Sequence, residues 1–169
     1  DQDIDLEDAD YKMNPPLRSE ADRLAMLEGV LDGSIDIIAT DHAPHHVEEK
    51  ARGFAEAPFG IVGLETCFPL LYTYLVLEGL ISLERLVEML TLKPASLFNL
   101  DTGVLEPGRD ADITIIDPEA GFVIDVEEFS SLGKNTPFKG YQCKGKIIRT
   151  FVQGKEVYPG EGRNGVEKE

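Results

Sequence analysis

Cysteines and long apolar runs are both scarce in this chain, and each shortage excludes a class of protein. Only Cys67 and Cys143 carry thiols, far apart and outside any Cys-x-x-Cys motif, so we expect free buried thiols in a reducing cytoplasm. No apolar run approaches the roughly 18 residues of a membrane span, and no signal peptide precedes the first element. The sequence therefore predicts a cytoplasmic protein with no membrane partner.

Basic residues are also few. Lys and Arg number 16 against 32 Asp and Glu, which gives a net charge of −16. Such a charge disfavours binding to nucleic acid and to anionic membranes. It says little about a small anionic substrate, because a bound metal ion would dominate the local field. An apolar content of 42% and a charged content of 28% are typical of a globular protein.

The chain divides into two parts by composition. Residues 1–100 alternate helix and strand signals, and residues 101–160 are rich in Gly, Pro and β-branched residues. Residues 161–169 are polar, and we expect them to form a flexible tail. Residues 35–39 (Ile-Asp-Ile-Ile-Ala) predict a parallel strand buried on both faces. The fold class is therefore α/β, with a separate layer of short strands at the carboxyl end.

Capping residues mark the predicted helices. Ser19, with Asp22 three residues later, begins an amphipathic helix that Gly33 ends. The other predicted helices lie at residues 63–80, with a kink or break at Pro69, at 83–90 after an N-cap at Ser82, and at 94–98, which begins with Pro94. The predicted strands of the second part lie at residues 111–117, where Pro118 stops the first, and at 121–126, 147–152 and 156–158, with a hairpin turn at residues 154–155.

The most informative segment is residues 37–46 (Ile-Ile-Ala-Thr-Asp-His-Ala-Pro-His-His), which holds all 3 histidines of the chain. A short apolar run ends in Asp41, and Pro44 prevents the strand from continuing. Asp41 is therefore expected at the carboxyl end of a strand, with His45 on the loop beyond it. Ligands and metals bind at this position in α/β proteins.

This segment resembles the last-strand motif of the cyclic amidohydrolases, and of the dihydroorotase family in particular. The resemblance is to the carboxyl-terminal portion of the long bacterial type and covers nearly the whole chain. It implies part of a (β/α)8 barrel in residues 1–100 and part of a small β-sandwich in residues 101–160. It also implies zinc and the reversible hydrolysis of the cyclic amide of dihydroorotate to N-carbamoyl-aspartate, in pyrimidine biosynthesis. The matching segments are residues 11–18, 40–45, 58–60, 63–66 and 135–140.

The resemblance further implies roles for single residues. Asp41 corresponds to the strand-end acid that binds metal, contacts the bound hydroxide and passes a proton from the attacking water to the leaving nitrogen. Asn14 and His45 correspond to side chains that contact the substrate. Phe59 and Gly60 correspond to a pair that offers backbone contacts, because free N–H groups ahead of a helix favour an anion. Chemistry on one small ring requires all of these groups in one concavity.

Each of these residues also has a structural interpretation. Asp41 is alternatively a cap, His45 an exposed loop residue, Asn14 a turn residue before prolines, and the Phe59–Gly60 pair a plain tight turn. We expect structural or solvated roles for the remaining polar residues near these motifs, which are Arg18, His42, His46, Glu65 and Lys93.

One departure from the family limits what this chain does alone. The family has a His-x-His motif on its first strand and further metal ligands on intermediate strands, and this sequence has none of them. A complete barrel needs roughly 200 residues or more. One ligand, Asp41, does not hold a catalytic zinc ion. We therefore expect a carboxyl-terminal portion of a larger enzyme, inactive alone, with the other ligands to one or two zinc ions outside it.

Two other functions remain open. The first is a related amidohydrolase activity, that of a dihydropyrimidinase (hydantoinase) or an allantoinase. The second is a non-catalytic scaffold with a dihydroorotase-like fold. The expected partners are the small-molecule substrate and either a second copy of the protein or aspartate carbamoyltransferase. The sequence encoded upstream of Asp1 would separate these possibilities, because it would contain an intact or a degenerate His-x-His motif.

Overall fold

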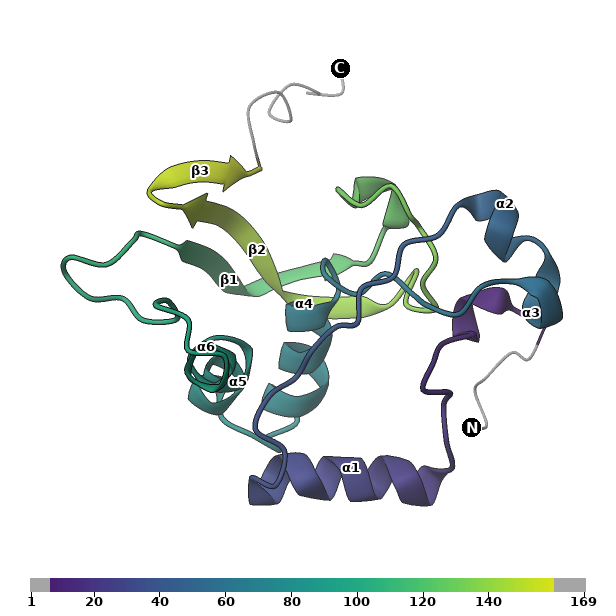
Figure 1. The fold of residues 1–169 in the computed structure, drawn as a ribbon, viewed down its shortest axis with the longest axis horizontal. Coiled ribbons are helices and arrows are strands. Elements are labelled where there is room, and N and C mark those ends of the chain that lie inside the picture. The colour runs from purple at the N-terminus through teal and green to yellow at the C-terminus, as the bar shows by residue number, and fades with distance from the viewer. Residues whose placement is uncertain (1–6, 160–169) are drawn as a thin grey trace.

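The computed structural model describes residues 7–159, so the predicted flexible tail lies outside the described residues. Helices occupy the first part of the described chain, and a small sheet follows them (Figure 1). None of the helices in this part is long and apolar enough to cross a membrane. The elements in chain order are η1 (Ala9–Tyr11), α1 (Glu20–Asp32), α2 (Val47–Lys50), α3 (Gly53–Glu56), α4 (Cys67–Leu71), η2 (Tyr72–Val76), α5 (Leu83–Leu90), α6 (Leu92–Leu97), β1 (Ile113–Val123), η3 (Val126–Glu128), β2 (Gln142–Val152) and β3 (Lys155–Tyr158).

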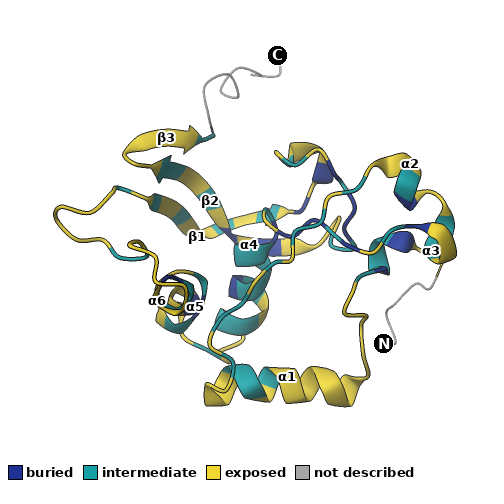
Figure 2. Cartoon of the chain, in the orientation of Figure 1, coloured by how far each residue is buried: buried dark blue, intermediate teal, exposed yellow. Residues whose placement is uncertain are grey.

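Helix α1 is bounded by the two caps that the sequence predicts. The Ser19 hydroxyl accepts the Asp22 N–H at 3.3 Å, and the Asp22 carboxylate accepts the Ser19 N–H at 3.2 Å, which completes a capping box. Gly33 ends the helix in the left-handed region at φ 85°. No residue of α1 is buried, and the helix lies apart from the sheet (Figures 1 and 2). The predicted helix is confirmed, whereas its apolar face is not buried within the described residues.

Residues 35–39 are extended but form no strand, so the predicted buried strand is wrong for the described chain. The Ile38 N–H donates to the Met89 carbonyl at 3.4 Å, which is a contact with a helix end. A strand requires a ladder of hydrogen bonds to a neighbouring strand, and residues 7–159 place none beside this segment. The segment is consequently half-buried or exposed. A single parallel bridge follows it, between His42 and Ile61.

Pro69 lies near a helix start and does not break the helix. Helix α4 begins at Cys67, so Pro69 lies in its first turn, where a missing N–H costs no intrahelical hydrogen bond. The same helix then passes into π-helical hydrogen bonding over Tyr72–Val76. The predicted helix therefore exists in a shorter form and does not break at Pro69, whereas a kink there stays a prediction.

Helix α5 contributes the most deeply buried side chains of the described core. Its predicted N-cap is confirmed, because the Ser82 hydroxyl accepts the Arg85 N–H at 3.1 Å. Leu86 and Met89 are fully buried, and burial of such side chains contributes roughly 1.5–3 kcal/mol each. Helix α6 begins slightly earlier than predicted, so that Pro94 lies within its first turn.

The second part of the chain forms one antiparallel sheet of three strands in the order β1-β2-β3. Strand β1 runs through Pro118, which corrects the prediction that this proline stops the strand. The pairing register shifts here, since Asp117 pairs with Lys146 and Gly121 pairs with Lys144. This irregularity accommodates a residue that has no N–H to donate.

The predicted hairpin between the last two strands is confirmed. Its turn lies at Gln153 and Gly154, with φ of 51° and 75°, one residue earlier than predicted. Positive φ at both central residues is the geometry that matches the twist of the flanking strands.

Strand β2 packs against the continuous helix of α4 and η2. Gly145 has φ 85°, and a Cβ at this position would lie 2.8 Å from the Tyr72 ring and 3.0 Å from the Phe68 ring. These two rings stack with centroids 5.7 Å apart. Glycine is therefore needed for the close approach of the sheet to the helix. The described residues form one β layer, and the sandwich and its boundaries at residues 101–160 stay a prediction.

Candidate functional site

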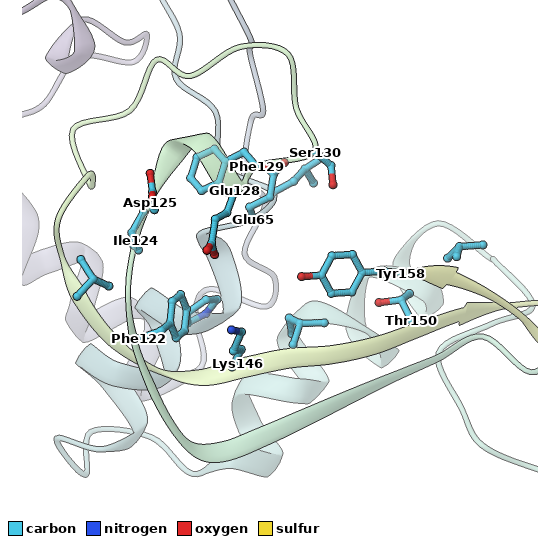
Figure 3. Close-up of a pocket in the computed structure, with 15 residues that line it drawn as sticks. Glu65, Phe122, Ile124, Asp125, Glu128, Phe129, Ser130, Lys146, Thr150 and Tyr158 are labelled. Atoms are coloured by element: carbon cyan, nitrogen blue, oxygen red, sulfur yellow. The ribbon is translucent and has the colours of Figure 1, made fainter. Parts of the chain in front are cut away.

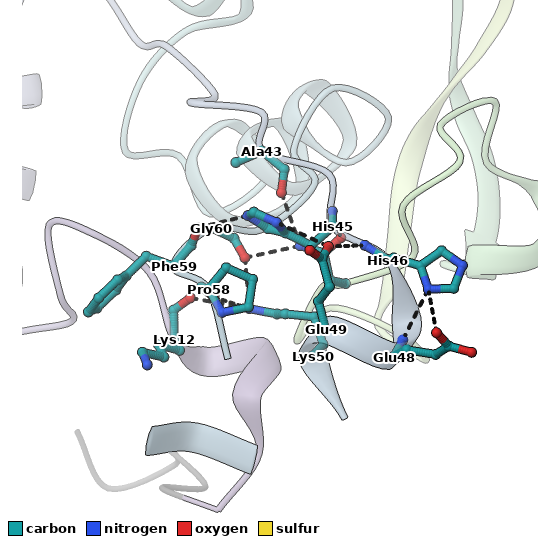
Figure 4. Close-up of polar contacts among 11 residues, drawn as sticks. Lys12, Ala43, His45, His46, Glu48, Glu49, Lys50, Pro58, Phe59 and Gly60 are labelled. Atoms are coloured by element: carbon teal, nitrogen blue, oxygen red, sulfur yellow. Dashed lines mark hydrogen bonds and ion pairs between the residues drawn. The ribbon is translucent and has the colours of Figure 1, made fainter. Parts of the chain in front are cut away.

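Three of the predicted site residues meet where two loops cross. The loop of residues 43–45 lies against the loop of residues 58–60, and a His45 ring nitrogen, Nε2, lies 2.9 Å from the Phe59 carbonyl oxygen (Figure 4). Because a carbonyl only accepts, Nε2 is the protonated nitrogen of this contact. Gly60 has φ 130°, and a Cβ there would lie 2.5 Å from the Ala43 Cβ and 3.1 Å from His45 Nε2. The loops approach this closely because residue 60 has no side chain.

Two buried lysines, Lys12 and Lys50, contact the second loop, and no sequence pattern predicts their burial. Lys50 Nζ donates to the Gly60 carbonyl at 2.9 Å and to the Pro58 carbonyl at 3.2 Å (Figure 4). Burial lowers the pKa of Lys50 from its usual value. Lys12 Nζ lies 4.6 Å from the centre of the Phe59 ring, a cation–π contact. In sequence, both lysines look like ordinary surface residues of polar loops.

The expectation that the Gly60 N–H is free to bind an anion is wrong for the described chain. This N–H donates to the Lys12 carbonyl at 3.0 Å, so it is not free. Helix α4 begins only at Cys67, several residues further on, so no helix N-terminus lies directly behind this amide. The proposed anion contact from the Gly60 N–H therefore has no structural support in the described chain. Gly60 contributes the close approach of the two loops.

Asn135 joins the two loops from far along the sequence. Its side-chain oxygen accepts the His45 N–H at 2.9 Å, and its side-chain nitrogen donates to the carbonyls of Ala43 and Gly60, each at 3.0 Å. Its own carbonyl accepts the Val62 N–H at 2.9 Å. The residue falls in a segment that resembles the family, but sequence reasoning assigned it no role, because nothing local indicates a partner about 90 residues away.

His42 and His46 have the structural roles that the sequence predicts. His42 Nδ1 accepts the Gly63 N–H at 3.1 Å and the Leu64 N–H at 3.3 Å. His46 is the N-cap of α2, where its Nδ1 accepts the Glu48 N–H at 3.3 Å (Figure 4). Both imidazoles therefore satisfy backbone donors.

Asp41 and Asn14 are exposed. Asp41 has φ 46°, a left-handed conformation that aspartate tolerates better than most residues. It lies two residues before Ala43, and Asn14 lies two residues after Lys12, so both are on segments that enter the crossing of the loops. A hollow of about 460 Å³ beside this crossing is lined by His45 but by neither of them. Their predicted convergence with His45 stays a prediction.

Metal binding requires more than this chain offers. Among residues 7–159, no three His, Cys, Asp or Glu side chains gather as a metal site would require. Asp41 fits one ligand position, because a carboxylate on an open segment is a usual oxygen ligand of zinc. A zinc site that includes Asp41 therefore needs ligands from outside the described residues.

The cysteines take no part in this site. Both are free thiols, as predicted; Cys143 is buried and Cys67 is half-buried. Burial raises the pKa of each thiol above its usual value. The protonated thiol is a poor nucleophile and a poor metal ligand, so neither residue is a candidate for catalysis.

A second cavity lies elsewhere, over the sheet. It measures about 370 Å³ and is lined mainly by apolar residues of the three strands and of the segment after β1, including Phe122, Phe129 and Tyr158 (Figure 3). Glu65 borders it, and its carboxylate accepts the Ser131 N–H at 2.8 Å, which confirms the structural role predicted for Glu65. Lys93 likewise pairs with Asp36 at 3.5 Å. This cavity contains none of the predicted site residues.

The sequence model of the amidohydrolase family matches residues 9–157. The chain belongs to the amidohydrolase family. Among its curated relatives, the dihydroorotase of Geobacillus thermodenitrificans is 60% identical and that of Bacillus caldolyticus is 58% identical, each over 158 residues. Each alignment covers 94% of this chain and 37% of the relative, so the chain spans well under half the length of these proteins. The predicted resemblance to dihydroorotases is confirmed.

Solved structures of the same superfamily also resemble the chain. The L-hydantoinase (dihydropyrimidinase) of Arthrobacter aurescens superposes on this chain with a TM-score of 0.80 at 39% identity. The superposition covers 89% of this chain and 36% of the hydantoinase. The dihydropyrimidinase of Brevibacillus agri superposes with a TM-score of 0.81 at 30% identity, over 88% of this chain and 34% of the dihydropyrimidinase. The predicted fold class is thus confirmed at the level of the amidohydrolase family.

Proposed function

We propose that this chain is the carboxyl-terminal portion of a zinc-dependent dihydroorotase, which interconverts dihydroorotate and N-carbamoyl-aspartate in pyrimidine biosynthesis. The observation that carries the proposal is the 60% identity to a dihydroorotase over 94% of the chain. That span includes the segment from Asp41 to His45 and the loop at residues 58–60. Below, the complete enzyme means the protein in which this chain follows the remaining part of the barrel.

In the proposed site, His45 binds the substrate from a fixed position. Its Nε2 is held by the Phe59 carbonyl, and its Nδ1 lies 3.9 Å from the Glu49 carboxylate, beyond hydrogen-bonding distance. Because Nε2 is already engaged, we propose that Nδ1 is the nitrogen that faces the ligand, with the Glu49 carboxylate beside it. When the ring is protonated, Nδ1 donates, which suits the carboxylate that distinguishes dihydroorotate from a plain dihydropyrimidine. Asn14 would supply a second polar contact to the same substrate.

Asp41 is the proposed proton carrier and metal ligand. Hydrolysis of a cyclic amide needs an acceptor for the proton of the attacking water and a donor for the leaving nitrogen, and one carboxylate serves both in turn. An exposed carboxylate at the end of an extended segment is free to reach a substrate above the loops. Phe59 and Gly60 form the wall against which His45 is held.

The alternative is a hydantoinase or dihydropyrimidinase, which the solved structures favour at 39% and 30% identity. The higher identity to dihydroorotases makes this the second candidate. A cytoplasmic location, a homodimer and an association with aspartate carbamoyltransferase are further proposals that follow from the first.

Substrate preference of the complete enzyme tests the proposal. Purified with zinc, it should cyclise N-carbamoyl-aspartate and hydrolyse dihydroorotate at least about a hundredfold more efficiently than dihydrouracil or hydantoin, because a site with polar groups for a carboxylate rejects rings that lack one. The comparison of kcat/KM for the three rings measures this. A preference for hydantoin or dihydrouracil would replace the proposal by its alternative, and no turnover of any ring would favour the scaffold.

A further inference from the structure

We infer that Asn135, which lies outside the barrel portion, is a positioning residue that sets the place of His45 in the substrate site. The inference rests on the proposed function, since it assigns Asn135 a part in substrate binding by that same site. One side chain here bonds both loops that form the crossing. The residues that it joins are 75 to 92 positions away in sequence.

The hydrogen-bond pattern fixes both the identity and the orientation of this side chain. A primary amide has two N–H donors and one oxygen acceptor, and Asn135 uses both kinds. The nitrogen faces the carbonyls of Ala43 and Gly60, and the oxygen faces the His45 N–H. A flipped amide would place like groups together at all three contacts. Only 5% of the residue is exposed, so water does not replace these bonds readily.

The segment that carries Asn135 is pressed against the loop of His45. A Cβ at Gly133 would lie 2.6 Å from the Pro44 Cβ, so this segment and Pro44 are already in contact. The Val62 N–H donates to the Asn135 carbonyl at 2.9 Å, which fixes the Asn135 backbone as well. Asn135 is thus a rigid support and not a mobile surface amide.

His45 is the point at which this support matters for binding. The Gly60 carbonyl is also held by Lys50 at 2.9 Å, so loss of Asn135 leaves it one donor. The Asn135 oxygen fixes the His45 backbone, while the Phe59 carbonyl fixes only the tip of the ring. Removing the amide should therefore displace His45 more than Gly60, and substrate contacts lose much of their strength when displaced by about 1 Å.

The experiment compares Asn135→Ala with Thr136→Val in the complete enzyme. Thr136 is the next residue and is equally buried, with 3% exposed, but its hydroxyl accepts only the local Phe138 N–H at 3.4 Å. We expect N135A to raise KM for dihydroorotate about tenfold or more with unchanged zinc content, and T136V to change KM less than about twofold. Both variants are expected to melt earlier than the wild type.

A double-mutant cycle identifies the route of the effect. If Asn135 acts through His45, N135A should raise KM less than about threefold in an H45A background, because effects of coupled residues are not additive. A purely structural role of Asn135 would raise KM by the same factor in the wild-type and in the H45A background. An unchanged KM in folded, zinc-loaded N135A, or full additivity with H45A, would overturn the inference.

Asn135→Asp covers the case in which N135A does not fold. This variant keeps the shape and the oxygen that faces the His45 N–H, but its carboxyl group donates to a carbonyl only when protonated. Its KM should therefore rise with pH more steeply than that of the wild type, and a pH profile equal to the wild type would contradict the inference. Failure of the wild-type enzyme to turn over dihydroorotate would instead overturn the proposed function, and the role of Asn135 with it.

Discussion

At the scale of single residues, the candidate site depends on groups that fix backbone rather than on groups that react. Lys50 and Asn135 both donate to the Gly60 carbonyl, at 2.9 Å and 3.0 Å, from distant positions in the sequence. Loss of either one leaves Gly60 the other donor, but it removes a donor from the Pro58 carbonyl in the case of Lys50 and from the Ala43 carbonyl in the case of Asn135. A buried carbonyl left without a donor costs roughly 1–3 kcal/mol. The His45 ring is held in the same manner, by the Phe59 carbonyl. His45, which would touch a substrate in the proposed site, is thus held at both its backbone and its ring.

Gly60→Ala tests the contact between the two loops directly. The new Cβ would lie 2.5 Å from the Ala43 Cβ in a backbone with φ 130°, so the two loops must separate. We expect KM for dihydroorotate in the complete enzyme to rise about tenfold and stability to fall by about 1–3 kcal/mol. Gly108→Ala is the matched control, because Gly108 also has a positive φ, 91°, with nothing within 4 Å. Steady-state kinetics and thermal unfolding of both variants measure the difference, and an equal KM for G60A and G108A would show that the loop contact is irrelevant to binding.

At the scale of elements, the sequence predicts what is decided locally and fails where a distant partner decides. The caps at Ser19, Gly33 and Ser82 were predicted correctly, because each needs only residues within one helical turn. The strand at residues 35–39 was not, because a strand exists only beside a neighbour. The continuation of β1 through Pro118 depends on its pairing with β2, which no local signal reveals.

In the candidate site, too, local features could be predicted from the sequence and contacts with distant residues could not. The exposed or loop positions of Asp41 and His45 follow from Pro44 and from the apolar run before it. The roles of Lys50 and Asn135 depend on contacts across the fold, and a lysine or asparagine in a polar loop carries no sign of burial. The family resemblance implied only that His45 and Phe59 line one concavity, and the direct contact between them, across 14 residues of sequence, was not predicted.

The capping box of α1 allows a prediction about pH. The Ser19 hydroxyl, together with the Ser19 N–H, holds the pKa of Asp22 below its usual value. A lowered carboxyl pKa stabilises the helix end fully above the pKa of the unfolded chain, and this contribution is lost as pH falls through the lowered value. Ser19→Ala removes the hydroxyl and keeps the backbone N–H, so it should raise the pKa of Asp22 part of the way to its ordinary value and make the first turn of α1 less sensitive to acid.

An NMR titration of the side-chain carboxyl carbons measures this change. Asp32 serves as an internal control, because its pKa is also lowered, by the Ser34 hydroxyl and N–H at the other end of the helix. We expect Asp32 to titrate identically in the wild type and in S19A. An unchanged Asp22 titration in S19A would show that the capping box does not form in solution.

At the scale of the whole molecule, residues 7–159 provide the base of the proposed site, but no three metal-ligating side chains gather within them. It spans 37% of the length of the dihydroorotases to which it is 58–60% identical. Among residues 7–159, large apolar side chains such as Met26 and Leu64 stand more than half exposed, at 62% and 64%. We therefore propose that the residues of the candidate site complete an active site only together with the rest of a barrel.

The most direct measurement transfers the chain into a known relative. In the Geobacillus thermodenitrificans dihydroorotase, the segment that aligns with this chain at 60% identity would be replaced by it. The account predicts that the folded, zinc-loaded chimera cyclises N-carbamoyl-aspartate, that the isolated chain does not, and that Asp41→Ala in the chimera abolishes turnover. Activity within about tenfold of wild type in the D41A chimera, or a folded, zinc-loaded chimera without any activity, would contradict it.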